Sequence, residues 1–342
     1  MPDFRFSQEY VQLDLFNDFG SLDRREIVAT YVTELTRNKA LVLFDVSHFS
    51  RLVGFSEGLL HAISAAPFYF YRRFDVPKKS GGLRTICEPF PTLKLIQRFI
   101  AEQVIANSEP HKAARAFRQN HSLRGAAVIH KARPYMLTLD IRDFFPTISG
   151  FSVYRVFFDL GYTAQIARLL SGLCTLENGL PQGAPTSPAL SNLVLRRFDE
   201  VIFNECKSRG VFYTRYADDM TFSSREDNLA DLIGVVRKEL RTDGLKLNSK
   251  KTVMAGKGAR KYVNGVVVNE RPNILREKRR NLRKDLYYIK KYGINGHVRF
   301  SNIDIPNYLD HLIGKLTYAH FITKDQKYKE DAAYLYELKK LT

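Results

Sequence analysis

Two adjacent aspartates, Asp218 and Asp219, stand between two short runs of residues that favour β-strands. Residues 211–215 and 220–222 are rich in aromatic and β-branched side chains, so this segment is predicted to form a hairpin with both carboxylates at its tip. Neighbouring carboxylates repel each other, and a divalent cation such as magnesium, which prefers oxygen ligands, would neutralise both. A solvated turn is the other interpretation, and the pair by itself does not exclude it.

A third aspartate lies far upstream, where another predicted strand ends. Residues 137–139 alternate in polarity and lead directly into Asp140. Residues 180–188, which lie between Asp140 and the hairpin, form a loop rich in glycine and proline that leads into a predicted helix. Only the folded chain can bring Asp140 to the hairpin. Carboxylates that converge in this way can bridge two metal ions, which clamp the attacking and leaving oxygens of an in-line displacement.

Taken in this order, these segments resemble the palm of a reverse transcriptase. Residues 140–145 (DIRDFF), 180–183 (LPQG) and 216–219 (YADD) are similar to the polymerase motifs A, B and C. Residues 244–252 resemble motif D of bacterial reverse transcriptases, and residues 76–86 resemble their fingers motif. The combination is specific, so the chain resembles an RNA-directed DNA polymerase.

The resemblance implies an α+β fold, a right-hand polymerase with fingers, a ferredoxin-like palm and a helical thumb. We expect an N-terminal helical extension over residues 1–70, fingers over 71–130, the palm with the catalytic core over 131–268, and a thumb that binds RNA over 269–342. Apolar residues recur at helical spacing in the extension and in the thumb, which supports helices in both.

Roles for individual residues also follow from the resemblance. Asp140, Asp218 and Asp219 are implied to be catalytic and to hold two Mg²⁺ ions, with the backbone carbonyl of Ile141 as a further ligand. Arg84 is the candidate for the triphosphate of the incoming dNTP, because a guanidinium offers planar, paired donors.

Three further residues are implied to touch the nucleotide. Phe145 lies five positions after the first aspartate, where reverse transcriptases place the aromatic ring that excludes a 2′-hydroxyl; core packing is the alternative. Gln182 would contact the incoming nucleotide, and Gly183 beside it would let the backbone approach closely. Lys251 would protonate the leaving pyrophosphate, with the neighbouring Lys250 as the alternative.

The charge balance favours a polyanionic partner. The chain has 53 lysines and arginines against 36 aspartates and glutamates, a formal net charge of +17, and binding to nucleic acid would release counterions. Many of these cations fall on the predicted first helix of the thumb, where a merely solvated face is the alternative to a phosphate contact. We expect RNA contacts from Arg276, Arg279, Arg280, Arg283 and Lys284.

Among reverse transcriptases, the chain resembles the bacterial retron enzymes most, in its short length and in residues 213–219. Those enzymes usually carry an Asn-Ala-x-x-His element before motif A and a Val-Thr-Gly element after motif D. Here Ala126 replaces the asparagine and Asn264 replaces the threonine, while His130 keeps the histidine. Both elements are linked with the retron's own RNA, so these departures bear on RNA recognition and leave the polymerase chemistry unaffected.

The resemblance therefore implies an enzyme that copies part of a structured noncoding RNA into single-stranded DNA, branched to the RNA through 2′-5′ priming. It further implies an RNA–DNA hybrid product, an associated effector protein and a role in defence against phage. A diversity-generating, CRISPR-associated or abortive-infection reverse transcriptase is the first alternative. A noncatalytic RNA-binding scaffold is the second, and the three intact aspartates disfavour it.

The cysteines and the hydropathy bear on the compartment. Cys87, Cys174 and Cys206 show no paired spacing, so we expect free thiols in a reducing bacterial cytoplasm. No stretch approaches the roughly 20 apolar residues that span a bilayer, so no membrane partner is expected.

Overall fold

The computed structural model describes residues 24–78, 81–302 and 305–340 of the 342-residue chain. The beginning of the predicted N-terminal extension, residues 1–23, lies outside the described residues. The same holds for residues 303–304 and 341–342 of the predicted thumb.

A four-stranded antiparallel sheet with the order β4-β5-β3-β6 carries the centre of the fold. Its strands are β3 (Tyr135–Asp140), β4 (Phe212–Tyr216), β5 (Asp219–Ser224) and β6 (Val253–Ala255). Helices lie between β3 and β4 and between β5 and β6, so the chain runs β-α-β-β-α-β. This order confirms the predicted ferredoxin-like palm.

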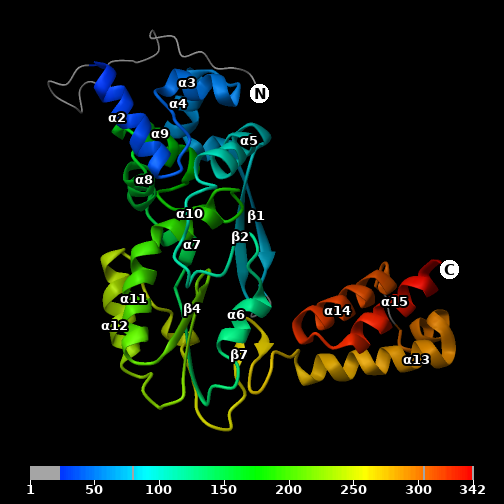
Figure 1. Ribbon diagram of the computed structural model, residues 1–342. Coiled ribbons are helices and arrows are strands. Elements are labelled where there is room, and N and C mark those ends of the chain that lie inside the picture. Colours follow the sequence, from blue (N-terminus) through cyan, green and yellow to red (C-terminus); the bar gives the residue numbers. More distant parts are fainter. Residues whose placement is uncertain (1–23, 79–80, 303–304, 341–342) are drawn as a thin grey trace.

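Helices cover the sheet on the side where α11 and α12 lie next to each other beside β4 (Figure 1). Phe198 and Ile202 on α11, and Val236 and Leu240 on α12, are fully buried at helical spacing. The helix expected after the loop at 180–188 is in fact two helices, because the backbone leaves helical geometry between α10 and α11. The palm helices are α7 (Phe144–Thr147), α8 (Gly150–Asp159), α9 (Ala164–Cys174), α10 (Ser187–Val194), α11 (Arg196–Ser208), α12 (Leu232–Thr242) and the short η4 (Ser249–Lys251).

The N-terminal helices belong to the same hydrophobic core as the palm and the fingers. Ile27, Tyr31 and Leu35 are buried on one face of α2, as predicted, and the Tyr31 hydroxyl donates to the carbonyl of Leu43 at 2.6 Å. These helices are therefore a structural layer of the catalytic unit. They are α2 (Arg24–Arg37), α3 (Val46–Val53), α4 (Glu57–Ala65) and the short η2 (Pro67–Phe70).

A long antiparallel hairpin forms the fingers, and Figure 1 shows it above β4 of the palm sheet. Its strands are β1 (Tyr71–Pro77) and β2 (Leu83–Pro89), and the helical segments α5 (Pro91–Phe99), η3 (Ile100–Val104) and α6 (Leu123–Ile129) follow. Between η3 and α6, residues 113–115 pair with Arg215, so this segment continues the palm sheet beyond β4.

Three helices at the C-terminal end form the thumb, which Figure 1 shows projecting to one side of the palm. They are α13 (Arg276–Phe300), α14 (Tyr308–Thr323) and α15 (Gln326–Lys340). Leu282, Leu286 and Ile289 form the buried stripe of α13, as predicted, whereas Leu275 precedes the helix. Gly293 breaks α13 with a positive φ of 71°, a conformation that glycine adopts without a steric penalty.

The thumb shares a second hydrophobic core with Met136 of β3 and with two further elements from the predicted fingers and palm. These elements are α6 and the small hairpin of β7 (Tyr262–Val263) and β8 (Val266–Val267). Arg124 of α6 also donates to the carbonyl of Ile322 in α14 at 3.1 Å.

The remaining observations concern thiols and hydropathy. Cys87, Cys174 and Cys206 are unpaired, as predicted. Within the described residues, no helix has both the length and the apolar character that crossing a bilayer requires.

Candidate active site

The sheet brings the three predicted aspartates to one place. Asp140 is the last residue of β3 and stands opposite Asp219, the first residue of the neighbouring β5. Ala217 and Asp218 form the two-residue turn between β4 and β5, and the Asp218 carbonyl accepts a hydrogen bond from the amide of Ile141 at 3.1 Å. The predicted hairpin with carboxylates at its tip is therefore present.

Asp140 is held in place from two sides. Its carboxylate accepts hydrogen bonds from the Asn248 side-chain amide at 3.0 Å and from the Lys251 ammonium at 2.6 Å. The Asp140 side chain is almost fully buried, whereas Lys251 is largely exposed. Hydrogen bonding to Asp140 raises the pKa of Lys251, so this lysine is a cation at neutral pH.

The carboxylates disfavour each other's charge. Burial, followed by the negative charges of Asp218 and Asp140, raises the pKa of Asp219 to about 6. Burial also raises the pKa of Asp218, and Asp140 adds to the rise while Lys251 and Arg84 oppose it. A bound cation would offset this repulsion and favour the charged carboxylates.

An oxygen-only donor set of this kind suits Mg²⁺. As the side chains stand, no three acidic, histidine or cysteine groups of the described residues converge to hold a metal ion. The two carboxylate oxygens of Asp140 instead accept hydrogen bonds from Asn248 and Lys251. Cation binding by all three aspartates would therefore compete with the ion pair between Asp140 and Lys251.

A buried ion pair supports the hairpin tip, and the sequence analysis missed it. Ala217 has a φ of 57°, which L-residues adopt only at a cost, and its carbonyl accepts from the Arg215 guanidinium at 3.0 Å. Arg215 binds both oxygens of Asp199 on α11, at 2.8 and 2.6 Å, and Asp199 also accepts from Tyr213 at 2.8 Å. Arg215 and Asp199 are fully buried, and such charges are tolerated only when they are paired. The pair fixes the backbone next to Asp218.

His130 fastens the same hairpin at its other end. It is fully buried, and its two ring nitrogens lie 2.7 Å from the Ser223 hydroxyl and 2.8 Å from the Thr214 hydroxyl. Burial, with the nearby charges of Arg115 and Arg133, lowers the pKa of His130 to about 3. A neutral, fully buried histidine that is hydrogen-bonded through both ring nitrogens has a structural role.

The fingers and the loop at 180–183 meet beside the carboxylates. Arg84 on β2 is exposed and close enough to Asp218 for its charge to lower the pKa of that carboxyl. The carbonyl of Gln182 accepts from the amide of Cys87 at 2.7 Å. A Cβ at Gly183 would lie 2.7 Å from the Cys87 carbonyl oxygen, so glycine is needed here for contact with β2. Contact with β2 is therefore one reason for glycine at this position, and the expected approach of the backbone to a nucleotide stays a prediction.

Phe145 lies in α7, a short helix that follows β3. Asp143 takes a left-handed φ of 45° and ends the extended chain, so the two phenylalanines occupy successive helical positions. Phe144 is buried beneath, while Phe145 is half-buried and its ring centroid lies 5.3 Å from that of Phe144. Phe145 packs partly against the hydrophobic core, and its ring also lies 6.2 Å from the exposed ring of Phe117. Its role as a steric gate stays a prediction.

The five thumb residues predicted to bind RNA divide between two faces of α13. Arg276, Arg280 and Lys284 are exposed and recur every four residues, which places them on one stripe. Burial raises the pKa of Tyr328 on α15, and the charges of Arg279 and Arg283 oppose that rise, so these two arginines lie towards α15. Arg276, Arg280 and Lys284 thus form one cationic stripe, and Arg283 is also exposed, on the side of the helix towards α15.

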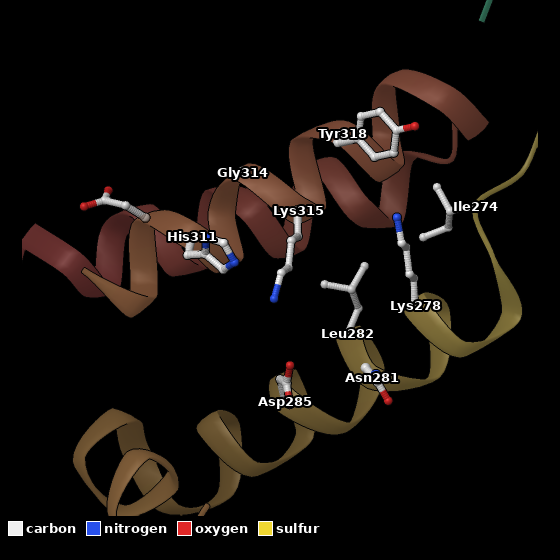
Figure 2. A pocket seen from close by; sticks show the side chains of 10 residues that line it. Ile274, Lys278, Asn281, Leu282, Asp285, His311, Gly314, Lys315 and Tyr318 are labelled. Carbon is white, nitrogen blue, oxygen red and sulfur yellow. The ribbon is translucent and has the colours of Figure 1, made fainter. Parts of the chain in front are cut away.

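A further face of α13 is directed towards α14. Figure 2 shows Leu282 and Asp285 of α13 facing His311 and Lys315 of α14 across a cavity of about 600 Å³. Lys278 lines the same cavity, so it does not extend the exposed stripe.

The two departures from the retron elements lie on neighbouring parts of the fold. Ala126 is buried on α6 in the core that also contains Val263 and Val266 of the β7–β8 hairpin. Asn264 and Gly265 form the turn of that hairpin with φ values of 50° and 79°. Asparagine tolerates this left-handed conformation, so the backbone of the turn explains an asparagine at position 264.

Carboxylates placed at adjoining strand ends of a ferredoxin-like palm, between fingers and a helical thumb, define a right-hand nucleotidyltransferase. Residues 76–267 match the family model described as "Reverse transcriptase (RNA-dependent DNA polymerase)". The chain belongs to this family, is an RNA-directed DNA polymerase, and is of the bacterial retron type.

Curated relatives carry the assignment to the retron type. The retron Ec86 reverse transcriptase of Escherichia coli is 32% identical over 258 residues, which cover 74% of this chain and 81% of the relative. The retron Ec83 reverse transcriptase of the same species is 31% identical, and the alignment covers 74% of this chain and 84% of the relative. The retron Mx65 reverse transcriptase of Myxococcus xanthus is 31% identical, and the alignment covers 75% of this chain and 62% of the relative.

The comparison with solved structures includes a match to a telomerase from Candida albicans in complex with a fragment of telomeric RNA. It has a TM-score of 0.46 and 12% identity, and the alignment covers 78% of this chain and 56% of the telomerase. A foamy viral protease–reverse transcriptase in complex with double-stranded DNA has a TM-score of 0.46 and 18% identity, covering 80% and 39%.

Proposed function

We propose that this enzyme copies part of one structured noncoding RNA into single-stranded DNA, starting from the 2′-hydroxyl of an internal guanosine of that RNA. The product would be DNA branched to its template RNA and paired with it as a hybrid. The observation that carries the proposal is the similarity to retron reverse transcriptases along three quarters of the chain. The net charge of +17 suits such a polyanionic partner.

Three aspartates and one carbonyl would hold two Mg²⁺ ions in this reaction. Asp140, Asp218 and Asp219 would be the ligands, with the backbone carbonyl of Ile141. When bound, the ions would lower the charge on the attacking and leaving oxygens of an in-line displacement. Lys251, protonated beside Asp140, would give its proton to the pyrophosphate as the bond to the α-phosphorus breaks.

The remaining site residues would select and orient the nucleotide. Arg84 would bind the triphosphate, since it already lies close to Asp218. Gln182 would contact the incoming nucleotide from the loop that is bonded to β2. Phe145, supported by Phe144, would exclude a 2′-hydroxyl by steric conflict.

RNA binding would rest on the thumb and on the elements that share its core. Arg276, Arg280 and Lys284 would contact phosphates along the exposed stripe of α13. Arg279 and Arg283, which lie towards α15, would contribute less. The domain boundaries would lie near residues 70, 130 and 268, and α6 and the β7–β8 hairpin would pack with the thumb across them.

The biological part of the proposal follows from the retron type. The enzyme would act in the bacterial cytoplasm, where its free cysteines stay reduced. Together with its RNA–DNA product and an effector protein, it would take part in defence against phage.

Sequencing the nucleic acid that copurifies with the protein tests the proposal. We expect one RNA species carrying DNA that is joined to an internal guanosine, and enzymes that cleave 2′-5′ linkages should release that DNA. In Asp218→Asn the same RNA should copurify without DNA, because RNA binding rests on basic side chains. RNA of random sequence together with unbranched DNA would contradict the retron assignment and leave a general reverse transcriptase.

A further inference from the structure

An exposed aromatic ring stands at the mouth of the candidate site, and no motif accounts for it. The ring centroid of Phe117 lies 6.2 Å from that of Phe145 and 6.5 Å from that of Tyr216, the tyrosine next to the hairpin tip. Phe117 is 48% exposed, so the protein itself does not cover this ring. An apolar surface left open between the sugar gate and the catalytic hairpin is suited to contact the nucleotide.

The backbone at Phe117 is held in an unfavourable conformation. Its φ of 58° is an outlier for a bulky residue. Asp143 and Ala217, which flank the same site, also have positive φ values of 45° and 57°. Such strain gathers at functional sites and persists only where the surrounding structure enforces it.

The preceding residues enforce the position of the ring. The amide of Arg115 donates to the Arg215 carbonyl at 2.7 Å, which attaches this segment to the edge of β4. Ala116 is buried, and its carbonyl accepts from the Asn192 side chain at 2.9 Å. The same catalytic hairpin that carries the aspartates therefore also fixes where the Phe117 ring lies.

A role in the hydrophobic core would require burial, and half of this side chain is exposed. A solvated surface residue would not require a strained backbone fastened to the catalytic hairpin. We propose that Phe117 packs against the nucleoside part of the nascent base pair, and that it contributes to nucleotide affinity in DNA synthesis. The inference rests on the polymerase function and names one more wall of its nucleotide pocket.

The test is steady-state primer extension by the full-length protein and its variants on a defined template. Phe117→Ala should raise the KM for dNTP on the order of tenfold, because an aromatic contact with the nucleoside is lost. Phe117→Tyr should restore the parent value because it keeps the ring. Phe158→Ala is the matched control, since Phe158 is 47% exposed on α8, and its KM should not change.

Thermal unfolding of the same variants separates contact from packing. Phe117→Ala should keep a Tm close to that of the parent, because about half of Phe117 is already exposed to solvent. Phe117→Gly should have a higher Tm than Phe117→Ala with the same KM, since glycine accepts a positive φ. An unchanged KM, or a Tm several degrees below that of the parent in Phe117→Ala, would overturn the inference.

A template with an abasic site tells which nucleotide the ring touches. If the KM effect of Phe117→Ala disappears on that template, the ring contacts the templating base. If the effect persists, the ring contacts the incoming nucleotide, and both results support the inference. Failure of the polymerase function itself would be seen separately, as no dNTP incorporation by the parent protein.

Discussion

Replacing Asp219 by asparagine should make the metal-free protein more stable while it abolishes DNA synthesis. In the folded protein, burial and two neighbouring carboxylates raise the pKa of Asp219 from an ordinary value of 3.8 to about 6. One pKa unit corresponds to about 1.36 kcal/mol, so the charged form costs about 3 kcal/mol of folding free energy. Partial hydration of the site reduces this, and we expect a gain of about 1–2 kcal/mol for Asp219→Asn.

The pH dependence identifies the cause. A carboxyl whose pKa is raised by folding destabilises the folded state only where it is ionised in the unfolded chain. The cost is therefore absent below about pH 4, grows between about pH 4 and 6, and is complete above pH 6. The stability difference between Asp219→Asn and the parent should follow this curve in urea unfolding with a chelator present.

A control and a cation complete the experiment. Asp159 is an exposed aspartate on α8, and Asp159→Asn should change the free energy of unfolding by less than about 0.5 kcal/mol. Addition of Mg²⁺ should stabilise the parent more than Asp219→Asn, because the ion removes the same repulsion. The reasoning is refuted if Asp219→Asn is less stable than the parent at pH 7.5, or if its advantage persists at pH 4.

Three further outcomes are expected. Phe145→Ala should incorporate ribonucleotides more readily with little loss of dNTP incorporation in primer extension; unchanged discrimination would show that another residue is the gate. Asp199→Asn should lower the free energy of unfolding by about 3–5 kcal/mol in urea, because it leaves the buried Arg215 unpaired, and a stable variant would contradict the assigned ion pair. Arg280→Glu should reduce the salt dependence of RNA binding in filter assays, since a phosphate contact is lost, whereas Arg283→Glu, directed towards α15, should change it less. Equal effects of the two arginines would argue against a single stripe.

Much of the catalytic centre could be predicted from local patterns. Asp140 follows an alternating run that reads as a strand, and Asp218 and Asp219 stand between two short strands, so strand ends could be assigned without knowing the fold. The pairing of β3 with β5 then places Asp140 opposite Asp219. Resemblance to reverse transcriptases supplied this pairing, which spacing alone does not specify.

Other parts depend on contacts between distant segments. Asp199 and Arg215 can be buried because they form an ion pair, although each residue by itself suggests a surface position. The arginine within a predicted buried strand was the signal in the sequence that could have indicated a buried partner. Phe117 has no motif, and its importance lies in a backbone angle and in two neighbouring rings. The division of Arg279 from Arg280 depends on where α15 packs, which helical periodicity does not reveal.

The shared core of the thumb has a consequence for dissecting the protein. A fragment that ends at residue 268, the predicted end of the palm, would lose α13 and α14 but keep the surface on which they pack. Ala127, Val263 and Val266, all fully buried in the intact chain, would then face water as a continuous apolar patch. Such a fragment would tend to aggregate, so a minimal soluble polymerase must either retain the three thumb helices or replace these side chains with polar ones.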